Sequence, residues 1–251
     1  MNRALGHPLR TEEHAAGPLA GGIAANGYQC GMVWGSALAA GAEAHRRFGA
    51  GHRAEAAALR AASRIADSFR ARNGAVDCFD LTGTDFGSRA QSWRYVLTGK
   101  PVGCIRMAAR YAPVALAEIR QALDAEPADA PAPPVSCSAL VARRLGASDL
   151  HAVMAAGPAR GGGLSGGGCG ALGAAVWLDA AGGGDRKAVE ARANRIVERF
   201  LDASGHAFEC SEIVGRRFAD VADHAAHLRG GGCASLLAVL AEPSGRQAEA
   251  P

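Results

Sequence analysis

The sequence predicts an all-α protein made of two pseudo-repeated helical bundles. Apolar residues recur at the spacing of one helix face, no segment alternates in the way of a strand, and β-branched residues are scarce. In the clearest segment the pattern is carried by Val189, Ala193, Ile196, Val197, Phe200 and Leu201. With 251 residues, of which 49% are hydrophobic and 20% charged, the chain can bury a substantial core and is not disordered.

The same periodicity places the helices in order along the chain. They are expected at about 30–46, 58–69, 104–123, 136–145, 168–180, 189–201 and 233–241. Between the third and fourth, the segment 125–134 is rich in proline and alanine and has no large apolar residue, which is typical of a semi-rigid linker. The predicted organisation is therefore a first unit at 1–124, a linker at 125–134 and a second unit at 135–251.

Charge and composition exclude several functions. The 27 Lys and Arg residues are nearly matched by 24 Asp and Glu, and aromatic residues make up 5%, so a nucleic-acid partner is not expected. The longest apolar stretch, Cys169–Leu178, is too short to span a bilayer, and the first residues contain no apolar signal segment. We therefore expect no membrane association and a cytoplasmic protein, where thiols are kept reduced.

Seven cysteines in such a protein need a chemical explanation, because an odd number cannot all pair and the cytoplasm gives structural disulfides no general use. None of them forms a C-x-x-C pair. This disfavours a zinc finger, a thioredoxin-type motif and c-type haem attachment. Any shared site must be assembled by the tertiary fold.

The two halves repeat each other around these cysteines. The pattern R-I-x-acid-x-F occurs at Arg64–Phe69 and again at Arg195–Phe200, and each copy is followed by A-apolar-acid-C-x-acid-apolar-x-G. Cys-Gly precedes each block and Gly-Cys follows it. The recurring cysteines are Cys30, Cys78 and Cys104 in the first half, and Cys169, Cys210 and Cys233 in the second. We interpret this as a tandem duplication.

Residues 137–240 resemble the four-cysteine family named after its motif, C_GCAxxG_C_C. The motif is matched by Cys137, by the segment Gly168–Ala174 that contains Cys169, and by Cys210 and Cys233. The resemblance implies a small helical domain with a redox or iron–sulfur role. The first half has no counterpart of Cys137, so it is predicted to be degenerate. A fourth ligand there would have to come from His7, His14, another group or a partner chain.

The leading hypothesis is an iron–sulfur cluster used for electron transfer or redox sensing. Thiolates are the usual cluster ligands, and glycines beside them permit the close backbone approach that a cluster needs. The cofactor ligands would be Cys137, Cys169, Cys210 and Cys233, with Cys30, Cys78 and Cys104 as further metal ligands.

Two other functions stay open. The same cysteines could act as a metal-free thiol–disulfide oxidoreductase, since Cys169 and Cys233 follow glycine runs and are expected to begin helices, which lowers a thiol pKa. A non-catalytic metal-binding or interaction module is the third. No catalytic residue is assigned, and the expected partners are an unidentified redox protein or a second copy of the chain.

Two weaker motifs are given structural interpretations. The G-x-G-x-x-G spelled by residues 168–173 is expected to be a turn into a tightly packed helix and not a dinucleotide site, because no strand precedes it. His224 and His227 share one helix face, and we expect surface or capping roles for them. Finally, the thiols of each half are predicted to converge on one centre.

Overall fold

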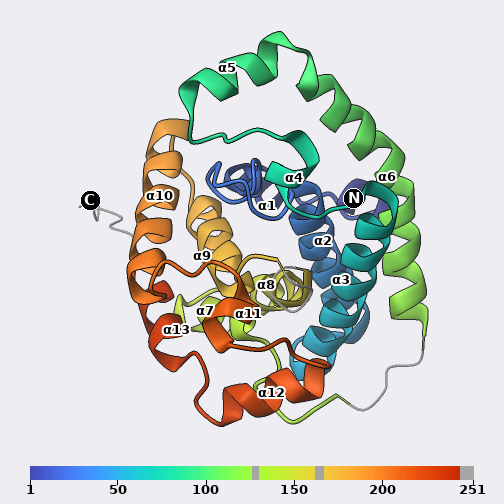
Figure 1. Ribbon diagram of the computed structural model, residues 1–251. Helices are drawn as coiled ribbons and strands as arrows, with labels where there is room; N and C mark the ends of the chain where they lie inside the picture. Colours follow the sequence, from blue (N-terminus) through green and yellow to red (C-terminus); the bar gives the residue numbers. More distant parts are fainter. Residues whose placement is uncertain (126–129, 162–166, 244–251) are drawn as a thin grey trace, which may run out of the picture.

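The computed structural model describes residues 1–125, 130–161 and 167–243. Within these ranges the chain forms helices and no strands, so the all-α prediction is confirmed (Figure 1). The first half contains two short 3-10 helices, η1 (Asn2–Leu5) and η2 (Gly17–Leu19). Its α-helices are α1 (Arg10–Ala15), α2 (Gly31–Phe48), α3 (His52–Asn73), α4 (Cys78–Thr82), α5 (Arg89–Leu97) and α6 (Lys100–Asp124).

In the second half, the described residues form seven α-helices. They are α7 (Cys137–Arg144), α8 (Asp149–Gly161), α9 (Gly170–Ala181), α10 (Arg186–Ala203), α11 (Cys210–Val214), α12 (Val221–Arg229) and α13 (Ala234–Leu240). The linker between the halves is described only at 125 and 130–134. Its remaining residues, 126–129, lie outside the described part of the chain.

Local sequence explains where several helices begin and end. The side chains of Ser136 and Asp185 accept hydrogen bonds from backbone N–H groups in the first turns of α7 and α10. The short helices α4 and α11 both end at a glycine in the left-handed conformation, Gly83 and Gly215, where a side chain would be strained. These ends limit each helix to five residues, the first of which is a cysteine.

The two halves share one interior instead of packing as separate bundles. Helix α8 of the second half lies against both α2 and α3 of the first, near the centre of Figure 1. In the core between them, Val153 and Ala156 pack with Ala40, Ala58 and their neighbours. The prediction that the halves bury apolar faces against each other is confirmed.

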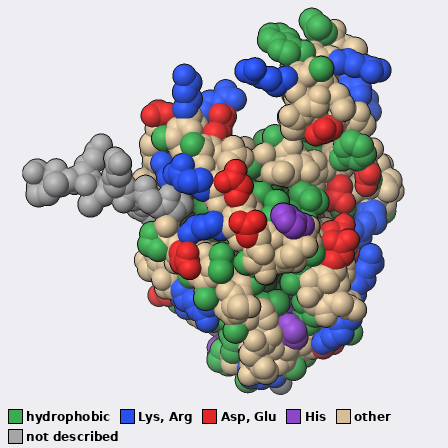
Figure 2. Space-filling model, turned by 60° about the vertical axis from the view of Figure 1, so that its left-hand side comes forward, with side chains coloured by type: hydrophobic (Ala, Val, Ile, Leu, Met, Phe, Trp, Pro, Cys, Tyr) green, Lys and Arg blue, Asp and Glu red, His purple; other side chains and the backbone are tan. Residues whose placement is uncertain are grey.

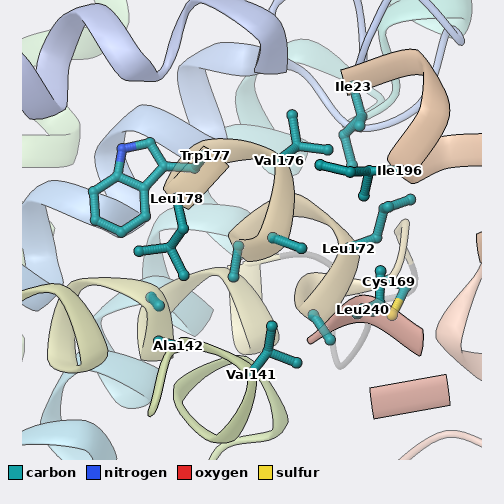
Figure 3. Packing of buried hydrophobic residues seen from close by; sticks show 14 of the residues in the cluster. Ile23, Val141, Ala142, Cys169, Leu172, Val176, Trp177, Leu178, Ile196 and Leu240 are labelled. Atoms are coloured by element: carbon teal, nitrogen blue, oxygen red, sulfur yellow. The ribbon is translucent and has the colours of Figure 1, made fainter. Parts of the chain in front are cut away.

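A second core cluster surrounds helix α9. Leu172 and Val176 of this helix pack in one cluster with side chains from α7, α10 and α13, and Ile23 of the first half lies beside them (Figure 3). Trp177 points the other way, where its ring packs edge-on against His151 of α8 and its Nε1–H donates to the carbonyl of Glu12 in α1. Cys169 lies at the edge of the cluster beside Leu240. Other helices surround α9, and nearly all of its residues are buried, which explains why its sequence is apolar around the whole helix.

No helix among the described residues is long and apolar enough to cross a membrane.

Helix α5 packs much less tightly, since none of its nine residues is buried and most of them are exposed. Its Trp93 is 68% exposed, whereas Trp34 and Trp177 are fully buried. We expect acrylamide to quench the emission of Trp93 and to leave that of the other two nearly unaffected. A Trp93→Phe variant should therefore lose almost all quenchable fluorescence. Quenching that survives this change would mean that a core helix opens in solution.

Candidate functional site

The four cysteines of the second half meet at one pocket. Cys137 and Cys210 are the first residues of α7 and α11, and Cys169 and Cys233 directly precede α9 and α13. All four line the same small cavity of about 20 Å³, together with apolar side chains and one histidine, His224. Four separate helix starts thus bring together thiols that are far apart in sequence. All four are free thiols.

Burial makes these thiols weakly acidic. It raises the pKa of Cys137, Cys210 and Cys233, and the neighbouring sulfurs add to the effect at Cys137 and Cys210. At Cys169 burial is the largest influence and raises the pKa to about 11, although backbone N–H groups at the start of α9 act in the opposite direction. The expectation that a helix start lowers the pKa of Cys169 and Cys233 is therefore wrong, because burial outweighs the helix end.

The glycines beside these cysteines serve packing. A Cβ on Gly168 would collide with the ring of Phe208, and one on Gly170 would collide with the backbone of Ala159. A Cβ on Gly232 would strike the ring of His227. A close contact within the protein thus explains each of these glycines. The sequence had suggested a different reason for them, namely a close approach of the backbone to a cluster.

Two histidines on α12 belong to this site. His224 is buried, its Nδ1 lies 3.2 Å from the carbonyl oxygen of Val135, and burial lowers its pKa to about 4. The Nε2 of His227 lies 3.7 Å from the Sγ of Cys233. The surface role expected for His224 is wrong. The signal that could have found the pair is its position just before Cys233, on the face of α12 that also carries Leu228.

The three cysteines of the first half also converge, but on a much larger cavity. Cys30 directly precedes α2, Cys78 begins α4 and Cys104 lies in the second turn of α6. They line a cavity of about 800 Å³ whose opposite wall is helix α10, with Arg186 and Glu190. Burial is the largest cause that raises the pKa of Cys30, and it raises that of Cys78 to about 12.

Tyr95 is part of this open site. Its hydroxyl donates a hydrogen bond to the Sγ of Cys104 at 3.1 Å, and its ring packs edge-on against Phe86. Neither His7 nor His14 is among the residues that line the cavity. Neither histidine therefore lies where it could act as the fourth ligand of this site.

The thiol sets are built on the same local backbone arrangement. Gln29 pairs with Asp77, one residue before Cys30 and Cys78, and Gly168 pairs with Glu209, one residue before Cys169 and Cys210. The N–H of Cys30 donates to the carbonyl of Val76 at 2.8 Å, and that of Cys169 donates to the carbonyl of Phe208 at 3.1 Å. That the halves arose by duplication stays a prediction, for which this shared arrangement is supporting evidence.

An aromatic pair joins the two arrangements. The ring of Tyr28, two residues before Cys30, stacks on the ring of Phe208, two residues before Cys210, with an angle of 2° between the planes. The carbonyl of Tyr28 accepts the N–H of Cys78, as that of Phe208 accepts the N–H of Cys169. The backbone segments that hold the two thiol sets therefore touch directly.

Asp77, which follows Val76 in the same backbone arrangement, is a carboxyl group whose surroundings disfavour its negative charge. Its Oδ1 is buried and accepts no hydrogen bond from the described residues. Burial, followed by the charges of Glu209 and Asp80, raises its pKa to about 6. The folded protein thus holds this proton more tightly than the unfolded chain does, so protonated Asp77 contributes to the stability of the fold. This contribution is complete below about pH 4 and is lost as the pH rises through 6.

We expect Asp77→Asn to stabilise the protein at neutral pH. The raised pKa corresponds to about 3 kcal/mol, which screening by water at this partly exposed site reduces to about 1–2 kcal/mol. The gain should be measured by urea unfolding across pH 4 to 8 and should vanish near pH 4. Asp202 is exposed and provides the control, since Asp202→Asn removes a carboxylate that water already surrounds and should change the free energy of unfolding little. A gain from Asp77→Asn that does not depend on pH would contradict the assignment.

No set of three or more His, Cys, Asp or Glu side chains in the described ranges is arranged to hold a metal ion. This applies to both thiol sites as they stand.

The comparison with known proteins concerns the first half. The sequence profile of the family described as "Putative redox-active protein (C_GCAxxG_C_C)" matches residues 1–117. This region belongs to the C_GCAxxG_C_C family. The recognised family is therefore confirmed, but on the half with three cysteines, whereas our motif came from 137–240. No curated protein and no solved structure matches the chain.

Membership links the open thiol site to redox chemistry at the level of the family. The matched region contains Cys30, Cys78 and Cys104, the three cysteines that line the large cavity. The assignment of 1–117 as a degenerate repeat is not tested by this match. Whether any of the seven cysteines binds a cofactor also stays a prediction.

Proposed function

We propose that the protein transfers or senses electrons through an iron–sulfur centre held by Cys137, Cys169, Cys210 and Cys233. The observation that carries this proposal is the meeting of four cysteines, from four helix starts, at one enclosed pocket. Four thiolates are the commonest ligand set of iron–sulfur clusters. The number and the chemistry of the four cysteine ligands support this proposal. The volume of the cavity does not add to that support.

The acidity of the thiols favours metal over disulfide exchange. A thiol must lose its proton to attack a disulfide, and burial keeps these four protonated at neutral pH. Binding iron replaces those protons with a cation and removes the cost of a bare buried charge. Burial therefore disfavours a free thiolate at these positions, but it allows a thiolate that is bound to iron.

The surroundings are suited to a redox centre. Phe218, Leu236 and Leu237 line the pocket and limit the access of water. His227 lies within hydrogen-bonding distance of the sulfur of Cys233. A ring N–H donated to a thiolate stabilises the more negative, reduced state, so His227 is a positioning residue that would raise the reduction potential.

The open site of the first half is proposed as the second thiol site, where Cys30, Cys78 and Cys104 are available to a metal or to exchange chemistry. Its large cavity leaves room for a substrate or for a group of a partner protein. We also propose a cytoplasmic location, in line with the use of free thiols.

Purification without oxygen tests the proposed function. We expect brown protein with iron and acid-labile sulfide in equal amounts, visible absorption that bleaches with dithionite, and an electron paramagnetic resonance signal in one oxidation state. Full-length protein that contains no iron after reconstitution, but forms a reversible disulfide among these four cysteines, would overturn the cluster in favour of thiol–disulfide exchange.

A further inference from the structure

The large exposed apolar side chains of the protein gather in one place. Those identified in the described chain are Phe79, Trp93, Val96, Leu97, Val102 and Ile105, on α4, α5 and the start of α6. Leu97 is 80% exposed and Ile105 67%. We call residues 89–110, which carry five of these six side chains, the arm. Figure 2 shows it as a projecting lobe at the top, where hydrophobic and basic side chains lie together.

The arm is also strongly basic. It carries Arg89, Arg94, Lys100, Arg106 and Arg110, all of them exposed, and no acidic residue occurs from 89 to 117. The chain as a whole has a net charge of only +3, so this local concentration is not a property of the entire surface. An apolar centre that contains Trp, surrounded by arginines, is the composition typical of a protein–protein interface.

The corresponding helix of the second half is covered. Helix α12 follows the third cysteine of its half, as α5 follows Cys78. It contacts α3, where Ala225 packs in one cluster with Leu59, and its His224 and Leu228 are also buried. The main contact of α5 is with α6. The face that α12 buries within the chain is thus left uncovered in α5.

The arm is connected to the open thiol site. Tyr95 lies on α5 between Trp93 and Leu97 and donates its hydrogen bond to Cys104. Tyr95 and Phe86 form the wall of the 800 Å³ cavity next to the arm. A protein bound to the arm would therefore stand directly over Cys30, Cys78 and Cys104.

We propose that the arm is a docking surface for a small acidic electron-carrier protein, which exchanges electrons with the iron–sulfur centre by way of the open thiol site and the stacked Tyr28 and Phe208 rings that join the two sites. This inference rests on the proposed function for its redox purpose. Its choice of partner rests on charge: five cations select a partner with an acidic face, and the exposed apolar side chains supply the buried centre of the interface.

Charge also separates this partner from two others. A second copy of the chain related by two-fold symmetry would bring one basic arm against another, which is repulsive. An anionic lipid surface would also suit the charges, but a flat bilayer has no projecting group that could enter the cavity beside the arm. A protein carrier explains both the patch and its position beside the cavity.

Isothermal calorimetry with a plant-type ferredoxin and, separately, a flavodoxin tests the proposal, since both are acidic one-electron carriers. We expect binding to at least one of them at low salt and at least a tenfold weaker affinity at about 0.15 M ionic strength. The double variant Arg94→Glu/Arg106→Glu should lose at least tenfold in affinity, and Arg94→Lys/Arg106→Lys should retain it. Trp93→Ala should weaken binding without changing its dependence on salt.

The matched control is Arg144→Glu/Arg217→Glu, the same change of charge at two exposed positions of the second half. It should leave the affinity unchanged. Equal loss from this control, or the absence of salt-sensitive binding to both carriers, would overturn the proposal. Binding to phosphatidylglycerol vesicles that is abolished by the arm variants, without carrier binding, would assign the arm to a membrane surface instead. Because heat reports binding and not electron transfer, failure here leaves the iron content of the protein, and so the proposed function, unaffected.

Discussion

Replacing Cys137 with serine is expected to remove the visible absorption of the iron–sulfur centre that we propose for the second half, and to leave the helices folded. Cys137 has no counterpart in the first half, and it begins α7 at the wall of the pocket. A hard oxygen is a poor substitute for a soft thiolate, so iron and sulfide should fall by at least half. Iron analysis, visible spectra and circular dichroism on protein purified without oxygen would measure the effect.

Cys30→Ser provides the comparison, because Cys30 belongs to the open site. If the second-half site holds the centre, this variant should keep most of the iron that Cys137→Ser loses. Equal loss from both variants would mean that one centre is shared between the halves. Redox activity that survives Cys137→Ser without any metal would instead indicate a disulfide between other cysteines.

Gly41→Ala is expected to produce a large loss of stability from a single methyl group. A Cβ on Gly41 of α2 would lie 2.5 Å from the Cα of Met154 on α8, and the contact is backbone, which cannot rotate away. On the other side of this crossing, Gly157 of α8 lies as tightly against Ala37. Overpacking of this kind costs about 3 kcal/mol, which should appear as a lower urea midpoint.

The same helix contains a matched control. Gly35 also lies within α2, but a Cβ there would meet nothing within 4 Å. Because alanine is the better helix former, Gly35→Ala should raise the free energy of unfolding by about 0.5–1 kcal/mol. If both variants destabilise the protein equally, α2 and α8 do not cross as closely as the structure indicates.

The sequence was sufficient for the long helices because their apolar faces have a clear period. The segment from Val189 to Leu201 lies within α10, and the periodic residues from Ala58 to Phe69 lie within α3. The short helices α4 and α11 could not be predicted, since five residues are too few to show a period. Helix α5 was missed because its apolar residues face solvent instead of a core.

The thiol site was predictable to a different degree. Repetition around Cys78 and Cys210 was enough to predict that the cysteines of each half would gather. It could not reveal that burial raises their pKa, because burial of Cys169 depends on residues from α8 and α13. His224 was missed for the same reason: it is covered by Phe218 and Val135, from parts of the chain outside α12.

The position of α8 in the sequence determines when the chain can complete its folding during synthesis. During synthesis α2 and α3 are complete at residue 73, but the helix that covers them ends at residue 161. At about 5–20 residues per second, their apolar faces stay uncovered for on the order of 10 s. Neither half can reach its final packing alone in that interval. The nascent chain therefore exposes apolar surface that is prone to aggregation, and folding is completed only after most of the protein has left the ribosome.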